Sequence, residues 1–452
     1  MNLLKTLIDY SLFNKYDKEY FIVNLLVPVF EDSISIKIAY CEETNIEKVK
    51  EKFVKIVNLI KVDKNDILFV LSSLETRLKL FLIVQKSSLL NIEEKYTSTF
   101  LDELILYSIE QRASDIHIEK FDNLVLFKFR VDGRLKIFFV YSEYFLKVVS
   151  SFLKLISNLD MTQTRLPLDG RFTRKIDENK FDFRLSTMPT IDAESIVIRI
   201  LDNKNIDKSL QTLGLSKNVF EDLKSSLNST YGLILVSGPT GSGKTTTLYS
   251  ILKELNSEEK KLITVEDPVE YHISSINQVP INSKIGLSFE LVLKNILRQD
   301  PDIIFIGEIR DKFSLDIALQ ASLTGHLVLA SIHANSAAQT ITRLIDLKAD
   351  PFLISTTLKA VMAQRLVLSF CKECEAKGCK KCNYTTYYDR TLISEIIRVD
   401  EEISRLIFEK ADISSFYNYL EQTSFKTMQK DGEQKVKEKI TSLKEVYRAV
   451  SV

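Results

Sequence analysis

Apolar and polar residues alternate through most of residues 113–201, and this period of two predicts β-strands. Two alternating runs flank Asp132-Gly133, a dipeptide typical of tight β-hairpins. A period near 3.6 predicts one helix before the first strand and another after the hairpin. The expected elements are a helix over 100–113, a strand over 114–119, a hairpin over 123–140, a helix ending near Leu159, and strands over 171–176, 181–187 and 195–201. Together they predict a small α+β domain.

Continuous apolar runs follow in the second half of the chain, where strand-like and helical segments alternate. The runs at 233–236, 303–306 and 327–330 are short and uninterrupted, which is typical of strands buried on both faces. Strands that alternate with helices favour a parallel α/β sheet. We therefore expect an α/β fold for this half.

The first 95 residues contain both segments with the period of a strand and segments with the period of a helix. Residues 33–40 alternate and predict a strand, whereas residues 46–61 predict an amphipathic helix. A short amphipathic helix is also expected at the start, carrying Leu3, Leu4, Leu7 and Ile8. Docking of that helix on its own domain is the leading interpretation, and membrane contact is the alternative.

These patterns divide the chain into three predicted parts. The polar stretch DNKNIDKSLQT, residues 202–212, predicts a linker before the α/β half. The predicted domains are an N-terminal α/β region over 1–95, the small α+β domain over 96–205, and the α/β domain over 206–452 with its C-terminal helices.

Composition narrows the functional classes. The 452 residues include 61 Lys and Arg and 61 Asp and Glu, so the net charge is zero. A uniformly basic, nucleic-acid-coating surface is therefore not expected, although a local basic groove remains open. The longest apolar candidate, 135–157, is interrupted by lysine and glutamate, and the N-terminus lacks the pattern of a signal peptide. We expect a cytoplasmic protein.

The strongest chemical signal is the stretch LILVSGPTGSGKTTTLYSIL at 233–252. An apolar strand leads into a glycine-rich loop whose N–H groups can surround phosphate, and a helix follows. Lys244 supplies a charge for the outer phosphates, and the Thr245 hydroxyl is a ligand for Mg²⁺. A turn without function is the alternative, but all four fixed positions of the motif match. The expected nucleotide-binding residues are Gly238, Pro239, Thr240, Gly241, Ser242, Gly243, Lys244, Thr245 and Thr246.

Acidic residues follow two further apolar runs. Glu266 and Asp267 lie at the end of the strand predicted in LITVEDPVE, and Glu308 follows 303–306. Either glutamate can orient Mg²⁺ or position the attacking water, and the spacing does not decide between these roles. A single acidic strand end is usually only solvated. Three strand ends within about 80 residues, one bearing a phosphate loop, favour one shared site.

Two of the four histidines bracket a third apolar run. His333 follows the strand over 327–330 and is expected on the phosphate side of the sheet, as a catalytic residue. His326 precedes the strand and is expected at the opposite end, where a structural role is equally open.

Four of the five cysteines lie within twelve residues. Two C-x-x-C pairs, Cys371 with Cys374 and Cys379 with Cys382, have the spacing of a structural zinc site. Nearby lysines offset the charge of four thiolates. A redox-active or merely exposed thiol cluster is the alternative.

Taken together, these motifs resemble the secretion-superfamily ATPases, specifically the assembly motors of type II secretion and type IV pilus or competence systems. The resemblance covers roughly residues 95–452. The matching motifs are GPTGSGKTTTLY, TVEDPVE, LRQDPDIIFIGEIRD, LTGHLVLASIHANSA, RASDIHIE, FRVDGR and AQRLV. It implies a RecA-like P-loop ATPase domain, a preceding PAS-like small domain and a short zinc-knuckle insertion. This sequence departs from the family pattern at Leu168, where the family usually has Gln, and at Ala193, where Gly is common.

The resemblance also implies partners and cofactors. These are ATP, Mg²⁺ and Zn²⁺, a homo-hexameric ring, an inner-membrane platform protein, and a docking partner for residues 1–95 at the membrane periphery. Small-domain arginines reach the nucleotide in this family, and the candidates are Arg130, Arg171, Arg184 and Arg199. No nucleic acid is expected as a partner.

Three alternatives stay open. A retraction motor shares the P-loop, but the tetracysteine element and the N-terminal region disfavour it. A nucleic-acid translocase is disfavoured by the neutral charge. A nucleotide-binding scaffold without turnover is disfavoured by Lys244, Glu266 and Glu308.

Overall fold

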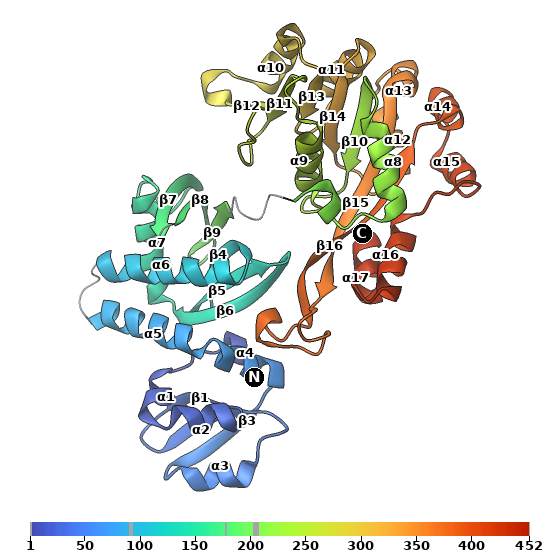
Figure 1. The fold of residues 1–452 in the computed structure, drawn as a ribbon. Coiled ribbons are helices and arrows are strands. Elements are labelled where there is room, and N and C mark those ends of the chain that lie inside the picture. The colour runs from blue at the N-terminus through green and yellow to red at the C-terminus, as the bar shows by residue number, and fades with distance from the viewer. Residues whose placement is uncertain (1, 90–93, 177–178, 202–207, 452) are drawn as a thin grey trace. The chain divides into compact units, whose positions relative to one another are not determined.

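The computed structural model describes residues 2–89, 94–176, 179–201 and 208–451 (Figure 1). Contacts divide the chain into two compact units. Unit 1 comprises Met1–Asp202 and Cys371–Tyr388, and unit 2 comprises Asn203–Phe370 and Asp389–Val452. Most of the predicted linker, 202–207, lies outside the described residues, and the three predicted domain ranges stay a prediction.

The N-terminal part of unit 1 is a three-stranded sheet with short helices. Strands β1 and β2 are antiparallel, and β3 pairs with β2 in parallel. Their apolar side chains form a core with Phe13 and Phe21 from the helices. The elements are η1 (Leu3–Lys5), α1 (Ser11–Lys15), α2 (Lys18–Val23), β1 (Leu26–Glu31), β2 (Ser35–Tyr40), α3 (Ile46–Lys52), β3 (Ile56–Lys61), α4 (Lys64–Ser72) and α5 (Leu74–Leu89).

Two expectations for this region are wrong. The helix expected over 46–61 ends at Lys52, and residues 56–61 form β3, where Val57 and Leu59 pack against the core. Pairing with β2 overrides the helical period, as tertiary context often does. The helix expected at the start is only the turn η1. The Asp9 N–H donates to Val29 O at 2.9 Å, which ties the segment after this turn to β1.

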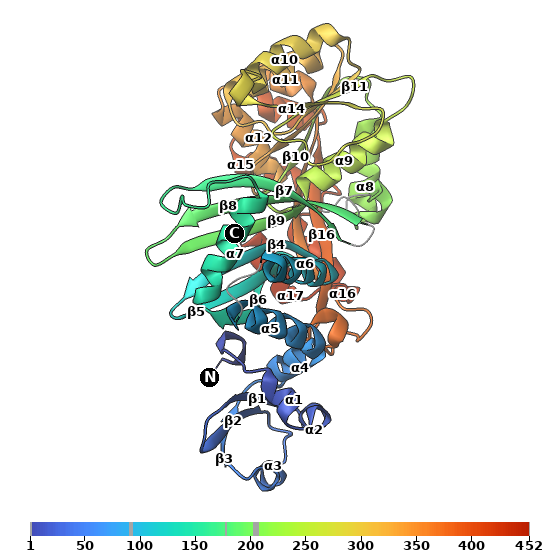
Figure 2. The same ribbon diagram turned by 90° about the vertical axis from the view of Figure 1, so that its left-hand side faces the viewer.

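The rest of unit 1 is built on a six-stranded antiparallel sheet in the order β6-β5-β4-β9-β8-β7 (Figure 2). Helices α6 and α7 cover one face, and a cluster of aromatic and aliphatic side chains fills the space between. The predicted strands and hairpin are confirmed. The elements are α6 (Glu94–Glu110), β4 (Ala113–Phe121), β5 (Leu124–Val131), β6 (Arg134–Ser142), α7 (Tyr144–Ile156), β7 (Leu168–Ile176), β8 (Asn179–Pro189) and β9 (Glu194–Leu201).

Unit 2 contains the predicted α/β sheet, in the order β12-β11-β13-β14-β10-β15-β16. The central pairs are parallel, and β10 lies between β14 and β15. The strands are β10 (Gly232–Ser237), β11 (Leu262–Glu266), β12 (Asn277–Pro280), β13 (Ile303–Ile306), β14 (Leu327–Ile332), β15 (Leu358–Phe370) and β16 (Tyr387–Arg398). Strands β10, β13 and β14 are buried along their whole length, as their uninterrupted apolar runs predict.

Helices cover both faces of this sheet (Figure 1). Helices α8 (Lys217–Leu227) and α9 (Lys244–Leu255) pack on one face through Leu223 and Leu248. Those on the other face include α10 (Phe289–Ile296), α11 (Lys312–Leu323), α12 (Ala337–Asp346) and α13 (Pro351–Thr357). The C-terminal helices are α14 (Glu401–Phe408), α15 (Ile413–Leu420), α16 (Met428–Lys437) and α17 (Leu443–Val450). Alternate strand residues therefore serve two cores, which is why the strands are apolar throughout.

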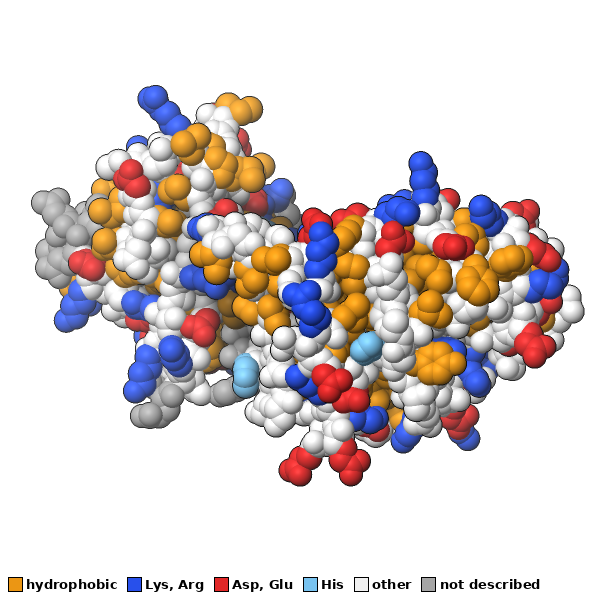
Figure 3. Space-filling model, turned by 90° about the horizontal axis from the view of Figure 1, so that it is seen from above, with side chains coloured by type: hydrophobic (Ala, Val, Ile, Leu, Met, Phe, Trp, Pro, Cys, Tyr) orange, Lys and Arg blue, Asp and Glu red, His pale blue; other side chains and the backbone are white. Residues whose placement is uncertain are grey.

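Positive and negative side chains are interspersed on the face that Figure 3 shows. This mixture agrees with the equal counts of basic and acidic residues. Among the described residues, none of the helices combines the length and the apolar character needed to cross a membrane.

Candidate nucleotide and metal sites

A pocket of about 730 Å³ lies in unit 2 at the carboxyl edge of the parallel strands. Its wall includes Thr240–Thr246, Glu266, Glu308, His333 and Arg390. Parallel α/β sheets bind ligands at this edge, and the volume is typical of small-molecule pockets. The fold thus gathers residues that follow four separate strands, β10, β11, β13 and β14, in the sequence.

The loop between β10 and α9 has a conformation that requires glycine. Gly238 has a φ of 151°, and a Cβ atom there would lie 2.4 Å from Ser242 Oγ. Gly243, with a φ of 88°, directly precedes α9. Residues with a side chain rarely adopt such φ angles, so the tight loop depends on both glycines. The buried Ser242 Oγ has no hydrogen-bond partner among the described residues, which fits a loop that hydrogen-bonds phosphate oxygens.

Lys244 folds back over this loop. Its Nζ donates to Gly238 O at 2.8 Å and to Pro239 O at 3.2 Å. Burial lowers the pKa of Lys244, and the nearby Glu308 carboxylate opposes this effect. The exposed Thr245 lies in the pocket wall, where its hydroxyl fits the predicted Mg²⁺ ligand. These residues fit a nucleotide with its metal.

A buried glutamine supports the loop from the neighbouring strand. Gln364 of β15 donates from Nε2 to Ser242 O at 2.8 Å, and its Oε1 accepts from Thr247 Oγ1 at 2.9 Å. Next to it, Arg365 donates to the backbone and side-chain oxygens of Asn335, both at 3.1 Å. Two adjacent residues of β15 therefore anchor the phosphate loop and the loop after His333. Both residues belong to the motif AQRLV, but nothing in the sequence indicates these contacts.

The Glu266 carboxylate is held by three donors. Its side chain is buried, and it accepts hydrogen bonds from Thr264 Oγ1 at 2.6 Å, from Gln278 Nε2 at 3.3 Å and from the Tyr249 hydroxyl. Burial raises the pKa of Glu266, and the three donors lower it. The net shift is upward, so Glu266 is a stronger base than an exposed glutamate.

Glu308 has different surroundings. Its Oε2 accepts from Arg310 Nε at 2.7 Å, and its Oε1 lies 2.9 Å from His333 Nε2. The expectation that His333 lies on the phosphate side is confirmed, because it shares the pocket wall with Lys244. Glu308, His333 and Arg310 thus form one polar cluster beside the loop.

His326 lies at the opposite end of β14, as expected. Its Nδ1 lies 2.9 Å from Ala321 O and 3.1 Å from Thr324 Oγ1. These contacts hold the turn between α11 and β14, so the structure gives His326 a structural environment.

Arg390 is a pocket residue that sequence reasoning missed. It lies on β16 in the pocket wall, and its guanidinium has no protein partner among the described residues. A lone arginine after the cysteine pairs carries no sequence signal of its own. The position of β16 at the edge of the sheet brings Arg390 to the pocket.

The four candidate arginines form one row across the sheet of unit 1. In register, Arg171 pairs with Arg184, Arg184 with Arg199, Arg199 with Asp115, and Asp115 with Arg130. Directly paired residues point to the same face of a sheet. The adjacent residues, such as Phe172 and Phe183, belong to the core beneath α6 and α7. The row therefore lies on the face away from these helices.

One carboxylate interrupts this row of cations. Asp115 accepts from Arg199 Nε at 3.1 Å and lies 3.7 Å from Arg130 Nε. The Arg184 Nε is buried without a hydrogen-bond partner among the described residues. Four guanidinium groups against one carboxylate leave a surplus of positive charge, which favours anions.

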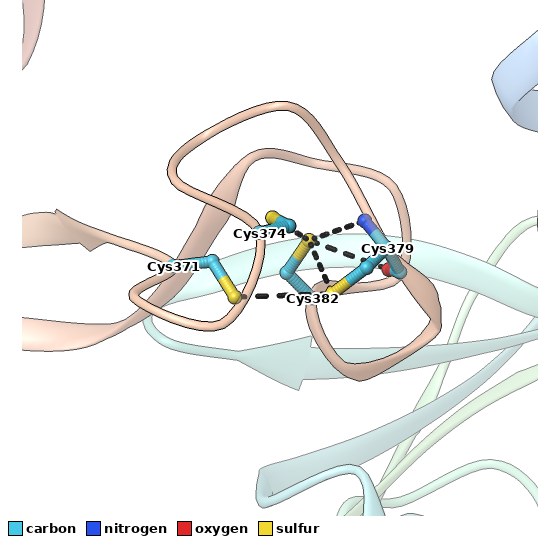
Figure 4. Close-up of side chains that lie close together, drawn as sticks. All are labelled: Cys371, Cys374, Cys379 and Cys382. Carbon is cyan, nitrogen blue, oxygen red and sulfur yellow. Dashed lines mark hydrogen bonds between the residues drawn. The ribbon is translucent and has the colours of Figure 1, made fainter.

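The four predicted zinc ligands converge (Figure 4). Their sulfur atoms lie within 4.8 Å of one another, and the closest pairs are 3.8 to 3.9 Å apart. Tetrahedral Zn²⁺ with Zn–S bonds of about 2.3 Å requires sulfur separations of about 3.8 Å. Backbone N–H groups of Gly378 and Cys379 point to Cys374 Sγ at 3.3 Å and Cys382 Sγ at 3.2 Å. The cluster fits a closed, structural zinc site.

The residues around this cluster bind to the rest of unit 1. Asn383 donates from Nδ2 to Gln111 Oε1 at 2.7 Å, and its carbonyl accepts from Lys136 Nζ at 3.3 Å. The Arg112 guanidinium stacks 3.7 Å from the centre of the Tyr388 ring. The cysteine insertion, which interrupts the sheet of unit 2 in sequence, therefore packs with the small domain.

Comparisons with known proteins agree with this site. Residues 92–448 match a family model described as Type II/IV secretion system protein. The chain is 40% identical over 356 residues to the type II secretion system protein HxcR of Pseudomonas aeruginosa, covering 77% of this chain and 76% of that one. It is 40% identical over 366 residues to the type II secretion system ATPase E of Vibrio cholerae, covering 75% and 73%.

Solved structures show the same fold. The ATPase DotB of Legionella pneumophila aligns with a TM-score of 0.63 at 24% identity, covering 78% of this chain and 95% of that one. The pilus retraction motor PilT with bound ADP aligns with a TM-score of 0.57 at 26% identity, covering 77% and 96%. The phosphate loop, the acidic strand ends and the histidine thus occur in a known context: the chain belongs to the family of Type II/IV secretion system proteins.

Proposed function

We propose that this protein is an ATP-hydrolysing motor that drives assembly of a type II secretion pseudopilus or a type IV or competence pilus. One observation carries the proposal: the phosphate loop, two acidic strand ends and His333 share one pocket wall. The names of the two bacterial relatives support the secretion role, since both belong to type II secretion systems.

The two glutamates have different proposed roles. Glu266 positions and deprotonates the attacking water, because its raised pKa and its position in the wall suit a general base. Glu308 orients Mg²⁺ together with Thr245, and His333 holds the Glu308 carboxylate in place. Bound Mg²⁺ would neutralise charge that develops on the phosphates. The contacts of the two carboxylates now favour one of the assignments that their spacing left open.

We also propose a homo-hexamer in which the arginine row of unit 1 contributes to nucleotide binding. A P-loop domain alone leaves one side of its nucleotide open, and arginines from another domain can stabilise the transition state. The surplus of cations and the unpartnered Arg184 Nε support an anionic ligand for the row. Arg130 and Arg171 at its two ends are the residues proposed to reach the nucleotide.

The proposed setting is the cytoplasmic side of the inner membrane. There the motor would act on a membrane platform protein, and residues 1–95 would dock on a cytoplasmic partner domain. The relatives' names support a secretion machine. Retraction is the second candidate, because one solved structure of this fold is a pilus retraction motor.

The Lys244→Ala variant tests the proposal. Phosphate release should fall to background and ATP affinity should weaken, because a charge-assisted contact of about 1.5–3 kcal/mol is lost. Lys253→Ala, at the other end of α9, is the matched control and should keep parental turnover. Near-parental turnover in Lys244→Ala would contradict the assignment of the pocket. Steep, salt-dependent binding to DNA would instead favour a translocase.

A further inference from the structure

The strongest unexplained feature of unit 2 is the hydroxyl of Tyr249. Its side chain is fully buried on α9, and the hydroxyl donates to Glu266 Oε2. The Tyr249 hydroxyl oxygen in turn accepts a hydrogen bond from the Glu270 N–H at 3.3 Å. A buried phenol with both a donor and an acceptor partner has one fixed orientation. This tyrosine is therefore a rigid connection between the P-loop helix and the end of β11.

The hydrogen bonds of Glu266 leave room for one more donor. A carboxylate has about four acceptor positions, and Tyr249, Thr264 and Gln278 occupy three of them. Glu266 also lines the nucleotide pocket. The free acceptor position is therefore the one available to a group inside the pocket, such as a water molecule.

The donors themselves are held in place. Gln278 Oε1 accepts the Ile273 N–H at 2.7 Å, so its Nε2 is directed at Glu266. The Tyr249 ring packs against Tyr271, with ring centres 4.4 Å apart, and against the edge of Phe305. Burial and the hydrogen bond to Glu266 raise the pKa of Tyr249, which keeps the phenol protonated as the donor of this pair.

The contact between Tyr249 and Glu266 joins the helix of the phosphate loop to a separate strand. Tyr249 lies five residues after Lys244 on the same helix, about 7.5 Å along its axis. Glu266 ends β11, which β13 and β14 separate from β10 in the sheet. Tyr249 links the Glu266 side chain directly to α9, and a helix transmits the position of its first turn to its second.

We propose that Tyr249 is a positioning residue for ATP hydrolysis, whose hydroxyl fixes the Glu266 carboxylate relative to the phosphate loop. This inference rests on the proposed role of Glu266 as general base. Thr264 and Gln278 complete the support, and among the hydrogen bonds of the described residues the one from Tyr249 connects Glu266 to α9.

The test is Tyr249→Phe in the full-length protein. Its kcat should fall about ten- to a hundredfold, because a hydrogen bond to a charged group is lost, and the KM for ATP should stay within about twofold. The acid limb of the pH–kcat profile should move to higher pH, because a lost donor raises the pKa of Glu266. Neighbouring Glu270 carries a charge that also raises this pKa, so it is kept unchanged in all variants.

A double-mutant cycle separates positioning from a general structural effect. In a Glu266→Gln background, Tyr249→Phe should cause little further loss, because its partner is already altered. Tyr419→Phe is the matched control: it removes a hydroxyl that donates to Asp400 Oδ2 at 2.7 Å on the exposed surface, and it should keep the parental profile. Affinity for a non-hydrolysable ATP analogue reports whether the pocket is intact.

Each result has a distinct meaning. A parental kcat and pH profile in Tyr249→Phe would overturn the inference, as would equal losses in both backgrounds. If Glu266→Gln itself hydrolyses ATP normally, the proposed role of Glu266 fails instead. If Glu266→Gln is slow while Tyr249→Phe is normal, only the positioning role of Tyr249 fails.

Discussion

Two glutamates end neighbouring strands of the sheet in unit 2, yet their surroundings differ. Glu266 is buried among neutral donors, whereas Glu308 lies between a cation and a histidine. Burial raises the pKa of Glu266. Similar positions at the edge of the sheet therefore place the two carboxylates in two different environments.

Both carboxylates were predictable because an acidic residue followed an apolar run. Their partners were not. Tyr249 and Gln278 lie 17 and 12 residues from Glu266, and their contacts depend on strand order and side-chain rotamers. Arg390 was missed for the same reason, since only the placement of β16 brings it to the pocket.

Glu308→Gln should retain ATP and Mg²⁺ while losing turnover. The amide keeps the shape of the side chain, but it lacks the charge that pairs with Arg310 and contacts His333. Affinity for ATP, measured by equilibrium binding, should be at least parental, and phosphate release should fall about a hundredfold or more. Asp316→Asn, on α11 and paired with Lys312 on the surface, is a control that should behave like the parent. Normal turnover in Glu308→Gln would place the metal-orienting group elsewhere.

Elements with one strong period were predicted well, and elements with competing signals were not. Strands β10, β13 and β14 are uninterrupted apolar runs, and the structure confirms them. Residues 46–61 have a helical period, but Val57 and Leu59 also lie at strand spacing, and pairing with β2 decides between the two structures. Local patterns cannot contain that information, because the partner strand lies elsewhere in the chain.

The cysteine insertion illustrates the same limit. The spacing of its four cysteines predicted a metal site, and their sulfur atoms do converge. Nothing in the spacing indicated which part of the protein the insertion would contact. Its hydrogen bonds to Gln111 and Lys136 show that it packs with unit 1.

Purified protein should contain about one zinc per chain by elemental analysis. Cys374→Ser should lose the metal and increase hydrogen exchange in β6 and α4, because Asn383 would no longer be held against Lys136. Hydrogen exchange in the phosphate loop should stay as slow as in the parent. Cys41→Ser, a buried cysteine outside the cluster, is the control and should keep its zinc. Freshly purified protein that was never exposed to a chelator and contains no metal would contradict the zinc assignment. Faster hydrogen exchange only in unit 2 would contradict the packing of the cysteine insertion with unit 1.

At the scale of the whole molecule, the arginine row has the clearest consequence for assembly. The family resemblance named four candidate arginines, and the strand register shows that they share one face. Arg171, Arg184 and Arg199 lie on three consecutive strands, whereas Arg130 lies about 40 residues earlier on β5. The spacing of these arginines in the sequence therefore does not reveal that they form a row. Its alignment supports a common ligand.

Turnover should therefore depend on assembly and on this row. ATPase activity per chain should fall on dilution. In the presence of a non-hydrolysable ATP analogue, light scattering should give the mass of a hexamer. Arg171→Ala and Arg130→Ala should lower kcat more than ATP affinity, because they act on the transition state. Arg174→Ala is the matched control, since Arg174 lies on the same strand but binds Asp102 of α6 on the other face. Full activity in a verified monomer would refute the ring.

The placement of Cys371–Tyr388 has a topological consequence. The chain enters unit 2 after Asp202, returns to unit 1 at Cys371 and re-enters unit 2 at Asp389, so the two units share three covalent crossings. A protease that cuts the first crossing leaves residues 371–388 covalently attached to unit 2 and joined to the rest of unit 1 by packing alone. A truncated fragment starting at residue 206 also carries an insertion stripped of its binding surface. A clean separation of the motor half requires replacing 371–388 with a short turn, so that β15 and β16 form a closed hairpin.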